Sequence, residues 1–214
     1  MPADSHQDST QVTDTSQLTP PQETVSKDGS STRNLIFFAL LVLIIVLPIR
    51  LYVAKPFIVS GASMFPTFDT WHYLIIDQLT YKLTPPSRGD VIVFRFPQNP
   101  SRFFIKRIIG LPNETVQLIG TVVTIFNDTH KEGFVIEEPY VTPENMKKTE
   151  LTMQLGDNEY FVMGDNRKAS ADSRYWGPLE SYRIIGRAYI RLFPFSDLGI
   201  LPGATTYNII SESE

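Results

Sequence analysis

The chain has 214 residues, of which 42% are hydrophobic, and its formal net charge is -4 at pH 7. This length and composition suffice for one core-forming domain with appendages. The acidic balance gives no support for nucleic-acid binding, which usually needs a basic face. Cysteine is absent, which excludes disulfides, thiolate metal sites and a cysteine nucleophile. The three histidines are far apart in the chain, so we expect no metal and no other cofactor.

Residues 1–33 are rich in Ser, Thr, Asp and Gln and nearly lack large apolar residues. Such a segment cannot bury enough surface to offset its ordering entropy, so we expect a disordered tail. Residues 35–49 then carry no charge. Extended through residue 54, the apolar stretch reaches about 20 residues, the length of a helix that crosses a bilayer. We therefore predict a single transmembrane anchor over residues 34–54.

Two other interpretations of this apolar stretch are a buried core helix and a cleaved signal peptide. A helix that is apolar on all faces has no obvious core to enter beside a disordered tail. The stretch is long for a signal peptide, and no small-x-small cleavage site follows it. Basic residues flank it on both sides, Lys27 and Arg33 before it and Arg50 and Lys55 after it, so charge does not fix its orientation.

From residue 57 onward the pattern is mostly that of β-strands. β-Branched and aromatic residues dominate residues 90–96, 103–109, 115–119, 122–126, 160–163 and 184–192. Gly120 and Thr121 separate two of these runs and indicate a hairpin turn. Sixteen prolines and twelve glycines punctuate the chain, and no segment after the anchor shows a long helical period. We predict a mainly β domain over residues 55–210, with an inserted β subdomain at about residues 111–158.

Ser63 is the first candidate site residue. It follows Gly61 and Ala62 and precedes the stiff pair Pro66-Thr67, so its hydroxyl is expected to be exposed, with room for a substrate backbone. In isolation, a serine near Gly and Pro more often makes a turn. A serine also needs a base before it can act as a nucleophile.

Lys106 is the candidate base. Alternation along a strand places it on one face with Phe104 and Ile108. Burial lowers a lysine pKa by up to roughly 3–5 units and yields a neutral amine able to deprotonate a hydroxyl. The structural alternative is an edge-strand lysine whose amine reaches solvent and discourages aggregation.

A polar loop over residues 164–174 supplies the third group. Asp172 and Arg174 are expected to form a charge-assisted pair that fixes the loop. Ser170 is expected to hydrogen-bond the amine of Lys106 and orient it. Without a neighbouring site, the same residues make a structural turn that leads into Trp176.

Four segments in this order resemble the conserved boxes of type I signal peptidases, membrane-anchored serine proteases that remove signal peptides from exported proteins. They are the serine box GxSMxPT within residues 59–67, the strand at 88–94, the lysine box FIKRIIGLP at 104–112, and GDNR…SxDSRxWG at 164–177. The resemblance implies an antiparallel β-sheet catalytic core. It also implies Ser63 as nucleophile, Lys106 as general base, and the supporting residues Ser170, Asp172 and Arg174.

The resemblance further implies cleavage after Ala-x-Ala-type sequences, with small residues at the first and third positions before the cut. By position match, the apolar residues lining those shallow pockets are Val59, Met64, Phe68, Phe104 and Ile105. The implied partners are signal peptides of exported preproteins and the lipid bilayer, with no nucleic acid and a monomeric enzyme. The catalytic domain is expected on the extracytoplasmic side of the cell membrane, or on the matching side of an internal membrane such as a thylakoid.

The chain departs from the family pattern at two places. Gly61 stands where some members have a serine whose hydroxyl donates to the oxyanion. In this chain, backbone N–H groups, including that of Ser63, are therefore expected to stabilise the oxyanion. Lys168-Ala169 replaces a usual acidic or amide pair. Lys168 is expected to add a positive charge near Lys106 and so help to keep its amine neutral.

Two alternative functions follow from the same residues. One is a Ser/Lys protease with another role, such as a self-cleaving repressor, which the predicted anchor argues against. The other is a catalytically silent, membrane-tethered β domain that binds exported proteins. Replacement of Ser63 would leave the function of the binding domain unchanged, whereas a protease would lose turnover.

Overall fold

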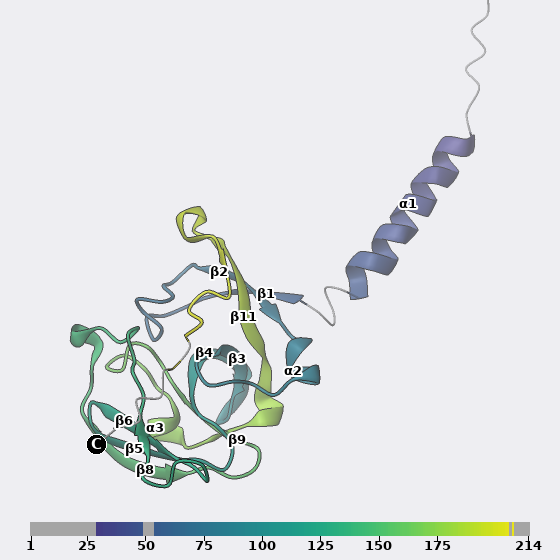
Figure 1. Ribbon diagram of the computed structural model, residues 1–214. Helices are drawn as coiled ribbons and strands as arrows, with labels where there is room; N and C mark the ends of the chain where they lie inside the picture. Colours follow the sequence, from purple (N-terminus) through teal and green to yellow (C-terminus); the bar gives the residue numbers. More distant parts are fainter. Residues whose placement is uncertain (1–28, 49–53, 206, 208–214) are drawn as a thin grey trace, which may run out of the picture. The chain divides into compact units, whose positions relative to one another are not determined.

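A computed structural model describes residues 29–48, 54–205 and 207 of the chain (Figure 1). Helix α1 spans Gly29–Pro48, so residues 29–33, predicted to be disordered, are helical instead. Adding residues to the end of an existing helix costs far less than starting one. The rest of the predicted tail and residues 49–53 of the predicted anchor lie outside the described residues. Among the helices that are described, none combines the length and apolar character needed to cross a membrane.

The larger of two sheets has eight strands in the order β1-β2-β11-β3-β4-β9-β10, with β12 paired to β11. Each strand pairs antiparallel with its neighbours. The strands are β1 (Ala54–Ile58), β2 (Tyr73–Asp77), β3 (Val91–Phe96), β4 (Asn99–Gly110), β9 (Glu159–Met163), β10 (Leu179–Glu180), β11 (Ile184–Phe193) and β12 (Gly199–Ile200).

The smaller sheet is also antiparallel, with the order β7-β6-β5-β8. Its strands are β5 (Thr115–Gly120), β6 (Val122–Phe126), β7 (Phe134–Val135) and β8 (Thr149–Gln154). These strands fall within residues 111–158, although the boundary of an inserted subdomain stays a prediction. Short helical turns are α2 (Thr80–Leu83), η2 (Pro143–Asn145), α3 (Ser173–Trp176), η3 (Ser181–Arg183) and η4 (Phe195–Asp197).

All six strands predicted from β-branched and aromatic runs are present, as β3, β4, β5, β6, β9 and β11. Strand β4 begins earlier than predicted because its pairing with β3 continues down to Asn99, opposite Phe96. Strands β1, β2 and β8 and the two-residue strands β7, β10 and β12 were not predicted. Pro56 obscures β1 in the sequence, but β1 is the first strand of the sheet, and a proline is tolerated at such an edge.

Three apolar clusters form the core, and β4 takes part in each. Ile109 joins the cluster that connects the two sheets, with Phe161 and Val116. Ile108 packs in a second cluster with Phe94. The third cluster lies around the turn that follows β1 and contains Met64, Phe68, Leu74 and Ile76, with Ile105 packed against it. Because β4 is buried from Lys106 to Gly110, the charged residues Lys106 and Arg107 enter the interior, whereas Arg102 of the same strand is exposed.

Candidate active site

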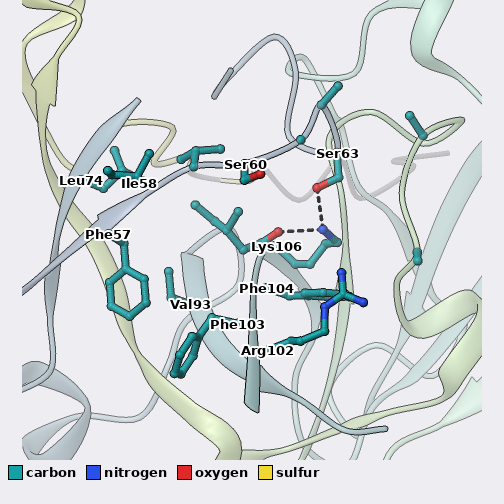
Figure 2. Close-up of a pocket in the computed structure, with 16 residues that line it drawn as sticks. Phe57, Ile58, Ser60, Ser63, Leu74, Val93, Arg102, Phe103, Phe104 and Lys106 are labelled. Carbon is teal, nitrogen blue, oxygen red and sulfur yellow. Dashed lines mark hydrogen bonds between the residues drawn. The ribbon is translucent and has the colours of Figure 1, made fainter. Parts of the chain in front are cut away.

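Ser63 and Lys106 come from separate elements and meet within hydrogen-bond distance. Ser63 lies on the turn after β1, and Lys106 lies on β4. The Nζ atom of Lys106 is 2.7 Å from Ser63 Oγ and 2.8 Å from the carbonyl oxygen of Ile105 (Figure 2). The structure therefore brings together the two residues that the sequence proposed as nucleophile and base.

The amine of Lys106 lies in a nearly dry environment, with the residue only 3% exposed. Burial lowers its pKa from 10.5 to about 8, because desolvation penalises the charged form. Asp172 and Asp165 oppose this change and Arg174 adds to it. Lys168 is exposed to solvent, which screens its charge. The expectation that Lys168 helps to neutralise Lys106 is therefore wrong, and burial has that role.

A pKa of about 8 gives Lys106 a useful population of free amine. At pH 7 about one molecule in ten is neutral, compared with about one in a few thousand for an unperturbed lysine. A neutral amine keeps two N–H groups, one of which donates to the Ile105 carbonyl. Its lone pair is then free to accept the proton of Ser63.

The serine turn is held by backbone bonds at Ser63 and directly after it. The Phe68 N–H donates to the carbonyl of Met64 at 2.9 Å, and the Asn166 N–H donates to the carbonyl of Ser63 at 3.1 Å. Gly61 has φ of +99°, in the left-handed region that favours glycine. A serine at this position would have to adopt that strained backbone, which gives a local reason for the glycine.

The predicted ion pair between Asp172 and Arg174 is present and almost fully buried. Arg174 donates from Nε to Asp172 Oδ1 at 2.8 Å and from Nη2 to Oδ2 at 2.9 Å. Asp172 also accepts from the Gly164 N–H at 3.1 Å, and Arg174 donates to the Arg167 carbonyl at 2.8 Å. Together these bonds close the loop over residues 164–174.

Ser170 is buried next to this pair, but the predicted hydrogen bond to Lys106 is not formed. In the described part of the chain, its hydroxyl has no hydrogen-bond partner. Lys106 directs its amine to Ser63 and Ile105 instead. Ser170 packs against Gly164, where a Cβ would lie 2.3 Å from the Ser170 hydroxyl oxygen. The expectation that Ser170 orients the lysine through a direct bond is therefore corrected.

Sequence reasoning missed a second buried ion pair, between Arg107 and Asp165. Arg107 donates from Nε to Asp165 Oδ1 at 2.9 Å and from Nη2 to Oδ2 at 2.7 Å. Thr67 donates its hydroxyl to the same carboxylate, and Gly89 accepts from Arg107 Nη1 at 3.0 Å. The pair thus connects β4, the polar loop and the serine turn. Arg107 directly follows Lys106 on an apolar strand, and a charged side chain buried there needs a partner of opposite charge. The sequence therefore contained a signal that Arg107 has a buried partner.

An open cavity of about 370 Å³ adjoins the Ser63–Lys106 pair. Residues 57–63 and 102–106 supply two of its walls. Among the described strands, β1 pairs with β2 alone, and β4 pairs with β9 only from Arg107 onward. Backbone groups of both strands are therefore unpaired along the cavity. Of the predicted lining residues, Val59, Phe104 and Ile105 line it.

Met64 and Phe68 do not line this cavity. Both are fully buried in the cluster around the serine turn, so a substrate cannot reach them in this arrangement. Neighbouring residues on the turn point in different directions, and Met64 enters the core where Ser63 faces the cavity. Further lining residues were missed, among them Phe57, Arg102, Phe103, Ala169 and Ala171.

A partly exposed serine hydrogen-bonded to a buried lysine beside an open, mainly apolar cavity is the arrangement of a serine hydrolase with a lysine base. A family model described as "Signal peptidase, peptidase S26" matches residues 32–193. The chain is 37% identical over 173 residues to Signal peptidase I of Leptolyngbya laminosa, covering 77% of this chain and 81% of the relative. It is 35% identical over 171 residues to Probable signal peptidase I-1 of Synechocystis sp., covering 76% and 83% of the two chains.

A crystal structure of a signal peptidase I from Enterococcus faecalis V583 has a TM-score of 0.42 and 29% identity to this chain. The similarity covers 49% of this chain and 97% of the crystallised one. The family model alone matches well over half of the chain. The chain belongs to the signal peptidase family, peptidase S26.

Proposed function

We propose that this chain is a signal peptidase I, a serine endopeptidase that cleaves N-terminal signal peptides from exported preproteins after small residues of the Ala-x-Ala type. The contact of 2.7 Å between Lys106 Nζ and Ser63 Oγ, inside a desolvated site, carries the proposal. Family membership and relatives named signal peptidase I support the class of substrate. No metal or other cofactor enters the proposed mechanism.

The reaction is an acyl transfer in two steps. Neutral Lys106 accepts the proton of Ser63 as Oγ attacks the carbonyl carbon of the scissile peptide bond. The C–N bond then breaks, the leaving amine takes the proton from Lys106, and the signal peptide stays on Ser63 as an ester. Lys106 next deprotonates a water molecule that attacks this ester. Cleavage of the ester returns the proton to Ser63 and releases the signal peptide.

The oxyanion that forms during each step needs a hydrogen-bond donor. The backbone N–H of Ser63 has no acceptor among the described residues, which supports its use for this purpose. Gly61 offers no side-chain hydroxyl. Oxyanion stabilisation in this chain therefore rests on backbone groups.

The substrate binds in an extended conformation between β1 and β4. Unpaired backbone groups along both strands support this mode, because an extended peptide can add to a free strand edge. Val59, Phe104 and Ile105 supply apolar contacts for small side chains before the cut.

Residues 34–54 anchor the protein in the cell membrane, with the catalytic domain on the extracytoplasmic side. The described helix α1 does not by itself have the length and apolar character to cross a membrane, so the support is the sequence, in which residues 35–49 carry no charge and the apolar stretch extends through residue 54. Flotation with phospholipid vesicles tests the anchor. The full chain is expected to float with the vesicles, and a chain starting at residue 55 is expected to bind them less. Equal flotation of both would overturn the anchor.

Cleavage of a preprotein with an Ala-x-Ala site tests the activity. Detergent-solubilised wild type is expected to cut at that site, whereas Ser63→Ala and Lys106→Ala are expected to be inactive. Failure of folded wild type to cut would instead favour a silent binding domain. Equal cutting by all three proteins would place the nucleophile elsewhere.

A further inference from the structure

Asn145 lies outside the four segments that resemble the signal peptidase boxes, yet it reaches the catalytic loops. It is the last residue of η2, between β7 and β8. The residue is 7% exposed, and its own N–H donates to the Thr142 carbonyl at 2.9 Å. A polar side chain this deeply buried is expected to have a specific hydrogen-bond partner.

The partners of Asn145 belong to two different loops of the active site. Its side-chain Nδ2 donates to the Phe65 carbonyl at 3.1 Å, two residues after the nucleophile. Its backbone carbonyl accepts from the Lys168 N–H at 3.2 Å, in the loop that contains Asp172. One residue therefore connects the serine turn to the polar loop.

Three alternate carbonyls of the serine turn receive donors from three different parts of the chain. The Ser63 carbonyl accepts from the Asn166 N–H at 3.1 Å. The Thr67 carbonyl accepts from Arg191 on β11 at 2.8 Å. The Phe65 carbonyl, between them, accepts from Asn145. Loss of this middle bond frees the part of the turn that fixes the direction of the Ser63 side chain.

We propose that Asn145 is a positioning residue for catalysis, which holds Ser63 at bonding distance from Lys106 by fixing the Phe65 carbonyl. This inference rests on the proposed function. Asn145 is not among the residues that line the cavity, so it acts through the turn and not on the substrate. A misplacement of about 1 Å at a reacting group can cost about a hundredfold in rate.

The test replaces Asn145 with leucine, which keeps a similar volume and branching but donates no hydrogen bond. Asn158→Leu is the matched control, because Asn158 is exposed in the turn between β8 and β9. For Asn145→Leu we expect kcat per folded molecule to fall about 10- to 100-fold, with KM within about twofold because the cavity is unchanged. The control is expected to retain wild-type kcat and KM.

Hydrogen exchange supplies a measurement that does not depend on activity. In Asn145→Leu, the Asn166 amide is expected to exchange at least about tenfold faster, since its bond to the Ser63 carbonyl is loosened. Amides of β5 and β6 are expected to keep their protection. Unchanged kcat per folded molecule, or faster exchange spread equally over β5 and β6, would overturn the positioning role. If wild type and Asn158→Leu fail to cleave, the proposed function fails, and exchange at Asn166 alone decides the role of Asn145.

Discussion

A Cβ atom on Gly164 would lie 2.3 Å from the carbonyl oxygen of Ser63. The same atom would lie 2.3 Å from the hydroxyl oxygen of Ser170. Glycine therefore allows the polar loop to approach the serine turn closely enough for the Asn166 N–H to bond the Ser63 carbonyl. Any side chain at this position must push Ser63 and the polar loop apart.

Gly164→Ala is accordingly expected to lower kcat/KM by about a hundredfold or more, because the displaced turn carries Ser63. Preprotein cleavage by the folded variant measures this loss. Gly156→Ala is the matched control, since a Cβ there would meet no atom closer than 3.4 Å. Wild-type rates for Gly164→Ala would show that the close approach has no bearing on catalysis.

Burial of Lys106 is expected to reduce stability at neutral pH. Its pKa is 10.5 when unperturbed and about 8 in the folded protein. At pH values below the folded pKa, Lys106 is charged in both the folded and the unfolded chain. Its burial then lowers the free energy of unfolding by the full amount, roughly 3 kcal/mol. Between the two values the unfolded chain binds more protons than the folded one, so stability rises with pH and the cost is relieved.

Lys106→Met removes this titration while keeping a long apolar side chain. We expect the variant to be inactive but more stable than wild type at about pH 7, by up to roughly 3 kcal/mol. The difference should shrink at about pH 10. Denaturant unfolding of both proteins at the two pH values measures the effect. An equal difference at both would contradict a depressed lysine pKa.

Asp172→Asn tests the buried ion pair and its field at Lys106. The change leaves Arg174 buried without its counter-charge and is expected to cost about 3 kcal/mol of stability. The charge of Asp172 raises the Lys106 pKa, so its removal should move the acidic limb of activity to lower pH. Asp157→Asn, at an exposed position, is the control. An unmoved limb in folded Asp172→Asn would exclude this coupling.

Lys106→Arg separates positive charge from basicity. A guanidinium stays protonated in proteins and cannot take the proton of Ser63. We expect cleavage to fall by about a thousandfold or more, whereas Lys131→Arg at an exposed position should have no effect. Initial rates on the same preprotein decide the matter, and an active Lys106→Arg enzyme would rule out the general base.

Local sequence signals predicted six of the described strands, β3, β4, β5, β6, β9 and β11. Strand β6 has the bounds expected from its β-branched run. Ser63 and Lys106 each have a common structural role when taken alone, so their pairing was predicted from the four segments that resemble the signal peptidase boxes, and their roles as nucleophile and base stay predictions. The directions of the Met64 and Phe68 side chains could not be predicted, because they depend on how the turn packs against Leu74 and Ile76.

The supporting contacts were harder to predict because they join distant parts of the chain. Arg107 and Asp165 are 58 residues apart, and Asn145 is 80 residues from Phe65. The position of Arg107 on an apolar strand signals that it needs a buried partner, but no local period or composition identifies Asp165 as that partner. Ser170 was correctly expected near the site, but the expected bond to Lys106 is not formed, because side-chain directions are not specified by the local sequence.

The most direct test of a neutral Lys106 acting on Ser63 is the pH dependence of kcat/KM for wild-type preprotein cleavage between about pH 6 and about pH 10. A lysine base with a pKa of about 8 predicts a plateau above that value. Below it, kcat/KM should fall about tenfold per pH unit, because only the free amine accepts the serine proton. A profile that stays flat from about pH 9 down to about pH 6 would contradict the lysine base.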